Sequence, residues 1–221
     1  MFMQNPNNAL SLRLRMRDLT HSYHEELNHH PLLMGLMQPN SLLSDYHKLL
    51  CAYFQIYQSL EDEIIRFLKA TPCIFDYAER LKLPWIVEDL QFFQHYPIDY
   101  PINQANLADK AVIIPEIAGI GHLVGILYVL EGSTLGGQFI SASLLKNHGL
   151  HGTQGARFYK GYGEKTALMW QDFIAFSETL NNDGVQCEAA AEAACQTFQL
   201  FIDVLDNHQH HKQQPSLEYI S

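Results

Sequence analysis

The segment from Tyr128 to Gln138 contains three glycines inside a stretch that otherwise predicts a helix. A glycine in a helix interior costs about 1 kcal/mol relative to alanine, so Gly132, Gly136 and Gly137 together cost about 3 kcal/mol. Gly132 and Gly136 lie one turn apart on the same face, where the absence of a Cβ lets another object approach the backbone. That object is either a second helix, which these facts alone favour, or a flat ligand.

A helix near the amino terminus carries the second set of candidate site residues. With about 3.6 residues per turn, one of its faces presents Arg17, Thr20, His21, His24 and Leu27. The simpler interpretation is a solvated polar face, and the alternative is a face that binds a ligand. In the alternative, the neutral imidazole of His24 offers a nitrogen to a metal, as single histidines do for haem iron. Arg17, two turns earlier, would then meet an anionic group of the same ligand.

The sequence lacks several other catalytic patterns. Its histidines form no zinc-protease motif with an accompanying glutamate, and no Glu-x-x-His pair recurs on two helices as a di-iron bundle requires. No GxGxxG or flavin pattern occurs, so any electrons must come from outside the chain. The cysteines form no CxxC pair and are expected to be reduced, mostly buried thiols; they are Cys51, Cys73, Cys187 and Cys195.

Length and composition indicate one globular domain. The chain has 221 residues, of which 47% are apolar and 17% charged, and this is enough to bury a full core. A net charge of −10 argues against nucleic acid as a partner, because binding to phosphates depends on lysines and arginines. The apolar run over residues 111–130 is interrupted by Pro115, Glu116 and His122, so no membrane span is expected. The amino terminus has no signal-peptide pattern, and we expect a soluble cytoplasmic protein.

Helical patterns dominate the chain and predict an all-α, single-domain helical bundle. Helices are expected over about residues 8–29, 41–70, 75–83, 85–94, 111–145, 165–180 and 185–207, with no strand. Asn8 or Ser11 is expected to cap the first helix. A glycine-rich loop is expected over residues 147–163. The expected organisation is a flexible amino terminus over residues 1–8, a helical domain over 9–207 and a polar tail over 208–221.

Two motifs together resemble the haem oxygenase family. The first runs from Met16 to Leu27 and includes Arg17, Thr20 and His24, with Met16 in place of the family's leucine. The second is the glycine motif, Tyr-Val-Leu-Glu-Gly-Ser-Thr-Leu-Gly-Gly-Gln, about a hundred residues later. The resemblance covers about residues 9–206 and includes residues 155–163 and the Met-Trp-x-x-Phe sequence over 169–173. Within the family, the sequence is most similar to the bacterial branch that makes biliverdin, often alongside phytochromes.

The resemblance implies a haem held between a proximal amino-terminal helix and a distal helix that kinks at its glycines. His24 corresponds to the proximal ligand of the haem iron, and Arg17 and Thr20 fall in the cofactor-binding group, with Arg17 the first candidate for the propionates. The distal, catalytic segment corresponds to Gly132, Ser133, Gly136 and Gly137, where a Cβ would clash with the macrocycle and dioxygen.

Ser133 departs from the animal members of the family, which place an aspartate at this position. Proton delivery would therefore run through Ser133, Thr134 or bound waters. Glu131 is adjacent in sequence, but its 100° offset on the helix is expected to point it elsewhere.

The activity that the resemblance implies is oxidative cleavage of haem to biliverdin, carbon monoxide and ferrous iron. Haem with its iron is then both cofactor and substrate, and dioxygen and an external electron donor, a ferredoxin or a flavin reductase, are needed. A biliverdin acceptor such as a phytochrome is a further implied partner. Two alternatives stay open on the same scaffold. One is a non-catalytic haem carrier, and the other is a thiaminase-type hydrolase, which would need a cysteine nucleophile.

Overall fold

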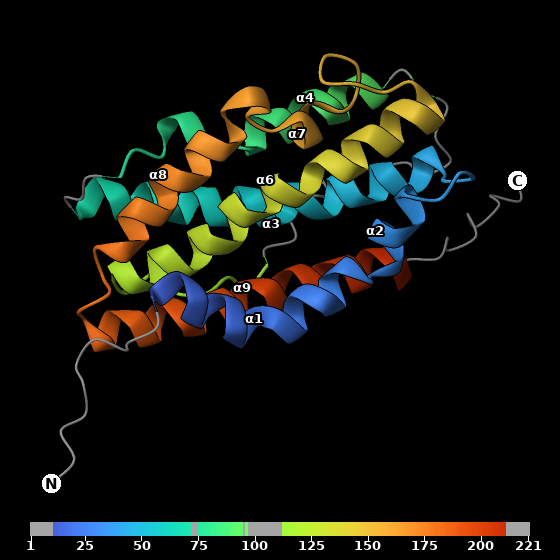
Figure 1. Ribbon diagram of the computed structural model, residues 1–221. Coiled ribbons are helices and arrows are strands. Elements are labelled where there is room, and N and C mark those ends of the chain that lie inside the picture. The colour runs from blue at the N-terminus through green and yellow to red at the C-terminus, as the bar shows by residue number, and fades with distance from the viewer. Residues whose placement is uncertain (1–10, 72–74, 95, 97–111, 211–221) are drawn as a thin grey trace, which may run out of the picture.

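The computed structural model describes residues 11–71, 75–94, 96 and 112–210, and over these residues the fold is all-α (Figure 1). The predicted class is confirmed: apart from isolated bridges at His151, the described residues form no strand. The predicted amino-terminal segment 1–8 and most of the predicted tail lie outside the described residues. The α-helices are α1 (Leu12–Asn28), α2 (Pro31–Leu36), α3 (Leu43–Ala70), α4 (Leu83–Phe93), α6 (Ile120–His148), α7 (Arg157–Lys160), α8 (Thr166–Glu178) and α9 (Gly184–His210), with 3₁₀ turns η1 (Ala78–Arg80) and η2 (Gly163–Lys165).

Local side-chain chemistry sets the ends of these helices. Ser11 caps α1, because its hydroxyl oxygen accepts a hydrogen bond from the backbone N–H of Leu14 at 3.4 Å. His30 caps α2, with Nδ1 accepting from the N–H of Leu32 at 3.2 Å. Gly149 ends α6 in the left-handed conformation, at φ +70°.

Several predicted boundaries were wrong. The glycine-bearing helix begins at Ile120 and not near residue 111, because Gly119 is fully extended, with φ −172°. The helix expected over residues 75–83 is only the 3₁₀ turn η1, because the chain turns there to bury Arg80 and Lys82. At the other end, α9 continues to His210. His208, placed in the polar tail by sequence, is buried with Nε2 3.0 Å from Oε1 of Gln55.

The central helix α6 packs most extensively on α9, and α1 lies along α9 on the same side of the bundle (Figure 1). The α6–α9 contact is close because of Gly121 and Gly125. A Cβ on Gly121 would collide with the backbone carbonyl oxygen of Gln186, and a Cβ on Gly125 with that of Ala190. Both carbonyls belong to α9. Close helix packing, which the sequence favoured for the glycines of the motif over residues 128–138, therefore occurs at Gly121 and Gly125, which precede that motif.

Among the described residues, only α6 is long and apolar enough to cross a membrane by length and composition. Half of its most apolar stretch is buried inside the fold.

Asp89 on α4 organises the loop that follows α6. Its carboxylate is buried and accepts hydrogen bonds from the backbone N–H groups of Arg157 and Phe158, at 2.7 and 2.8 Å, where α7 begins. Burial raises the pKa of Asp89 to about 6, although these two hydrogen bonds lower it. The aromatic side chains of Tyr53 and Phe158 pack together behind this contact, with ring centroids 5.1 Å apart.

We predict that Gly125→Ala destabilises the protein, with no ligand added, by about 1–3 kcal/mol, because α6 and α9 must separate to admit the new methyl group. Gly136→Ala is the matched control. A Cβ at Gly136 would have no atom within 4 Å, so this variant should gain up to about 1 kcal/mol from helix propensity. Urea unfolding of both variants measures the difference, and shifts of equal sign and size would contradict the packing role of Gly125.

The raised pKa of Asp89 predicts a pH dependence of stability. Between about pH 4 and 6 the folded protein holds a proton at Asp89 that the unfolded chain has lost, so the unfolding free energy falls as pH rises. Relative to Asp89→Asn, the parent should lose up to about 3 kcal/mol across this window. Urea unfolding at pH 4.5 and 7 tests this. Asp172→Asn, on the exposed face of α8, should show the same pH response as the parent. If the unfolding free energies of the parent and of Asp89→Asn changed equally between the two pH values, the raised pKa of Asp89 would be refuted.

Candidate functional site

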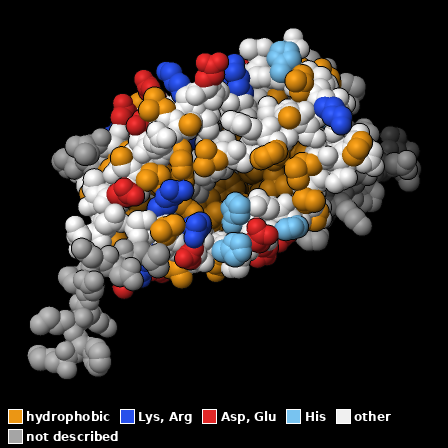
Figure 2. All heavy atoms as spheres, in the orientation of Figure 1, with side chains coloured by type: hydrophobic (Ala, Val, Ile, Leu, Met, Phe, Trp, Pro, Cys, Tyr) orange, Lys and Arg blue, Asp and Glu red, His pale blue; other side chains and the backbone are white. Residues whose placement is uncertain are grey.

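An apolar hollow lies between α1 and α6 (Figure 2). In this view hydrophobic side chains line the hollow, and histidine side chains stand along the lip formed by α1. His24 of α1 is exposed, and on α6 Ser133, Leu135 and Gly136 are exposed. The structure thus presents His24 and part of the glycine motif at the surface on the two helices that border one groove.

The His24 ring is held from two directions. Its edge packs on the Phe198 ring of α9, with centroids 5.9 Å apart and planes at 84°, and its Nδ1 lies 3.1 Å from Nδ2 of Asn28, one turn later. His24 Nε2 makes no hydrogen bond to any residue that the structure describes, so it is available to a ligand. Ligation through Nε2 requires Nδ1 to carry the ring proton, and the Asn28 amide would then present its oxygen to that proton.

Arg17 and Thr20 occupy different environments. Arg17 is exposed and pairs with the neighbouring Asp18 (Nη2 to Oδ1, 3.0 Å), a surface pair of little net energy that a ligand can displace. Thr20 is buried, and its hydroxyl donates to the carbonyl of Met16 at 2.8 Å. Thr20 therefore lies on the buried edge of the face that it was predicted to share with His24, one turn after the fully buried Met16, and its role in cofactor binding stays a prediction.

Tyr128 is a candidate site residue that the sequence argument did not single out. Burial raises its pKa, while a hydrogen bond with Thr20 and the charges of Arg13 and Arg17 lower it. Its phenol therefore joins α6 to the basic start of α1. The only sequence signal for this role is its position as the first residue of the glycine motif.

The three motif glycines have different surroundings. A Cβ at Gly132 would make ordinary contact with the Trp170 ring at 3.8 Å, and one at Gly137 would press on the Tyr159 ring at 3.3 Å. A Cβ at Gly136 would meet no atom within 4 Å. Packing among the described residues thus does not account for a glycine at position 136, whereas a flat ligand lying against the backbone would.

The hydroxyls of Ser133 and Thr134 both donate to carbonyls of their own helix. Ser133 donates to Leu130 at 2.8 Å and Thr134 to Glu131 at 2.7 Å, and α6 continues through them without a break. Because the Ser133 proton is used, the Tyr57 hydroxyl, 3.4 Å away, is the donor to Ser133 Oγ. Ser133 is therefore arranged as an acceptor at the surface of α6.

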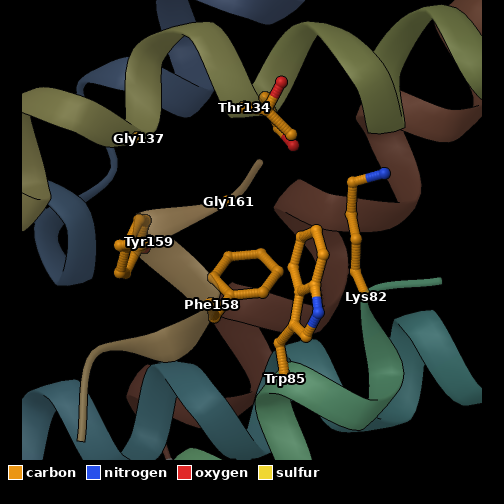
Figure 3. Close-up of a pocket in the computed structure, with 8 residues that line it drawn as sticks. Lys82, Trp85, Thr134, Gly137, Phe158, Tyr159 and Gly161 are labelled. Atoms are coloured by element: carbon orange, nitrogen blue, oxygen red, sulfur yellow. The ribbon is translucent and has the colours of Figure 1, made fainter. Parts of the chain in front are cut away.

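Glu131 points into the core, as its position on the helix predicts. Its carboxylate is fully buried and binds Arg80 Nη1 at 2.8 Å and Lys82 Nζ at 2.7 Å. The Tyr162 hydroxyl donates to the same carboxylate at 2.9 Å. Lys82, Ser133 and Thr134 also border a small pocket, which is completed by Trp85, Gly137, Phe158, Tyr159 and Gly161 (Figure 3).

The described residues contain no cluster of three or more histidine, cysteine, aspartate or glutamate side chains that could hold a metal ion. A single histidine such as His24 is the ligand set that a metal already held by a prosthetic group would need. An exposed imidazole, an apolar groove and uncovered backbone at Gly136 fit haem as that group.

These observations define an all-α domain with a ligand groove between its amino-terminal helix and its central helix. A family model described as Heme oxygenase matches residues 10–207, so the chain belongs to the haem oxygenase family. No curated protein sequence matches the chain.

Solved structures of bacterial haem oxygenases share the fold. The chain is similar to haem oxygenase from Neisseria meningitidis, solved with NO and CO bound, at 21% identity and a TM-score of 0.69, over 90% of this chain and 92% of that one. It is similar to haem oxygenase from Leptospira interrogans at 20% identity and a TM-score of 0.70, over 90% and 100%. It is also similar to haem oxygenase-1 from the cyanobacterium Synechocystis, solved with haem, at 18% identity and a TM-score of 0.63, over 90% and 92%.

Proposed function

We propose that this chain is a haem oxygenase of the bacterial, biliverdin-producing type. It binds haem in the groove between α1 and α6 and cleaves it with dioxygen to biliverdin, carbon monoxide and ferrous iron. The observation that carries the proposal is the pairing of His24, whose Nε2 is available, with the uncovered backbone of Gly136 on the helix across the groove. Family membership supports the same conclusion.

In this proposal the residues of α1 and α6 orient the bound haem. His24 would supply a nitrogen to the haem iron, and Phe198 and Asn28 fix the plane of its imidazole ring. Arg17 lies seven residues before His24, a rise of about 10 Å along the helix. Together with Arg13 and Tyr128 it would receive the propionates at the start of α1.

The bound haem would supply the iron at which dioxygen is activated. The side chains on α6 control what surrounds that position. Gly136 leaves room next to the backbone, and the Ser133 oxygen, fixed by Tyr57 and Leu130, accepts a hydrogen bond from a water and so orients it. Because Ser133 acts as an acceptor, the proton reaches the groove from that water and not from the serine itself.

The proposed partners follow from the chemistry. The electrons come from a cytoplasmic ferredoxin or flavin reductase, because the sequence holds no nucleotide-binding pattern. A biliverdin acceptor such as a phytochrome would take the product. A hydrolase on the same fold is disfavoured, because burial raises the thiol pKa of Cys51, Cys187 and Cys195 and so disfavours the nucleophilic thiolate. Cys73 lies outside the described residues.

His24→Ala tests the axial ligand. The haem-loaded variant should lose the parent's Soret and visible spectra, including the ferrous-CO form, and should not degrade haem with ascorbate. His21→Ala, three residues earlier and also exposed, is the matched control and should keep both properties. Spectra of His24→Ala that match the parent would make His21 the ligand. A parent that binds haem but never degrades it would be a carrier and not an oxygenase.

Gly136→Leu tests the bare backbone of α6. The leucine side chain would enter space that haem and dioxygen need, so the variant should fold and yet fail to degrade haem. Gly184→Leu is the control, because a Cβ at Gly184, the first residue of α9, also meets no atom within 4 Å. Circular dichroism and ascorbate-driven turnover should be measured on the same preparations. Normal turnover in folded Gly136→Leu would show that this position does not face the substrate.

A further inference from the structure

Four side chains form a buried charged cluster behind the glycine motif: Glu131, Arg80, Lys82 and Tyr162, here called the Glu131 cluster. Lys82 and Glu131 are fully buried and Arg80 is 4% exposed. Each proton of the Lys82 ammonium group has an acceptor: the Glu131 carboxylate at 2.7 Å, the Tyr162 hydroxyl at 3.0 Å and the Arg80 carbonyl at 3.2 Å. Arg80 Nη1 also donates to the carbonyl of Met169 on α8 at 3.0 Å.

Stability alone is a weak reason for such a cluster. Removing two cations and a carboxylate from water costs several kcal/mol per ion, and apolar side chains of similar volume often replace buried ion pairs without loss. Hydrogen-bonded ion pairs are directional, whereas an apolar contact allows the packed segments to slide and rotate against each other. The Glu131 cluster fixes one carboxylate of α6 against groups from two separate segments, namely η1 with the start of α4, and the connection between α7 and η2. Arg80 links the cluster in turn to α8 through the Met169 carbonyl.

Residues 132–137, which follow Glu131 directly, have little support on the groove side. Gly132 directly follows Glu131, and Gly136 has no side-chain or backbone neighbour on the groove side to hold it. Among the described residues, α6 is supported here by Tyr159 against Gly137 and by the walls of the small pocket. Figure 3 shows Thr134 on α6 above the rings of Trp85 and Phe158, with Lys82 beside Trp85.

We infer that Glu131 is a positioning residue: held by Arg80, Lys82 and Tyr162, it fixes the rotation and height of residues 132–137 across the groove from His24, and thereby selects the edge of the haem that is cleaved. This inference rests on the proposed haem oxygenase function. A neighbouring cluster provides a matched comparison. The Tyr77 hydroxyl donates to the buried Glu61 carboxylate at 3.3 Å, a bond of the same type that does not include α6. Glu61 adjoins the Glu131 cluster through the backbone N–H of Lys82, which donates to it at 2.6 Å, so the comparison separates loss of a bond to α6 itself from loss of a bond next to the cluster.

The experiment compares Tyr162→Phe with Tyr77→Phe. Glu131→Gln is the obvious variant, but it leaves Arg80 and Lys82 without their carboxylate and can unfold the protein. Tyr162→Phe removes one hydroxyl from the Glu131 cluster and leaves every charge paired, whereas Tyr77→Phe removes one from Glu61. Two measurements are made on each: amide hydrogen exchange of residues 132–137 in the haem-free protein, and the ratio of biliverdin isomers formed from haem with ascorbate.

We expect Tyr162→Phe to speed exchange of residues 132–137 by about tenfold, the effect of losing one hydrogen bond to a charged group. We also expect it to convert a dominant biliverdin isomer into a mixture, with Tyr77→Phe unchanged in both respects. Equal effects of the two variants, or no effect of Tyr162→Phe on either measurement, would overturn the inference. A parent that forms no biliverdin would refute the proposed function instead, and exchange in the haem-free protein would still decide whether the cluster holds the segment.

Discussion

The geometry of the groove depends on the close approach of α6 to α9 at Gly121 and Gly125. At these two glycines the backbones come so near that no side chain fits between them. Helix α1, which carries His24, packs mainly on α9, and it meets α6 directly through the hydrogen bond between Thr20 and Tyr128. The distance between the two lips of the groove is therefore set by a backbone contact made elsewhere in the bundle. This arrangement keeps the groove open without requiring α1 and α6 to touch along its length.

The far wall of the groove is supported independently. Residues 132–137 receive their support from η1, α4, α7 and α8, through the Glu131 cluster and through aromatic rings beneath Gly137. None of these segments carries His24. The two sides of the site can therefore be altered separately by mutation, since residues that hold the imidazole and residues that hold the glycine segment share few partners. Asp89 contributes to the second side by fixing the start of α7.

The sequence was sufficient for the fold class, because helical periodicity is a local property. The candidate site residues came from the two motifs that resemble the haem oxygenase family, and their roles stay predictions. The sequence also predicted that Glu131 points away from the groove, which follows from its angle on the helix. Partners far apart in the chain were not predictable: the approach of Gly125 to Ala190, or of Arg80 to Glu131, depends on tertiary packing. The same limit explains the false helix over residues 75–83, where burial of two cations overrides local preference.

Thr20 illustrates a second limit. A helical wheel groups residues by angle but does not say where the buried face ends, and Thr20 lies just inside the boundary while His24 lies outside it. Tyr128 was overlooked for a related reason. As the first residue of a motif dominated by glycines, it gave no separate signal, although in the structure it joins α6 to α1.

The partner of His24 has a consequence for electron transfer. Asn28 offers Nδ1 a neutral amide, which cannot draw the ring proton away as a carboxylate does, so the imidazole keeps little imidazolate character. Under the proposed function, a neutral hydrogen-bond partner would strengthen the imidazole as a ligand less than a carboxylate would, and the bound haem would be reduced at a higher potential. A comparatively mild reductant would then suffice, and one side-chain amide on α1 would widen the range of donors able to serve this protein.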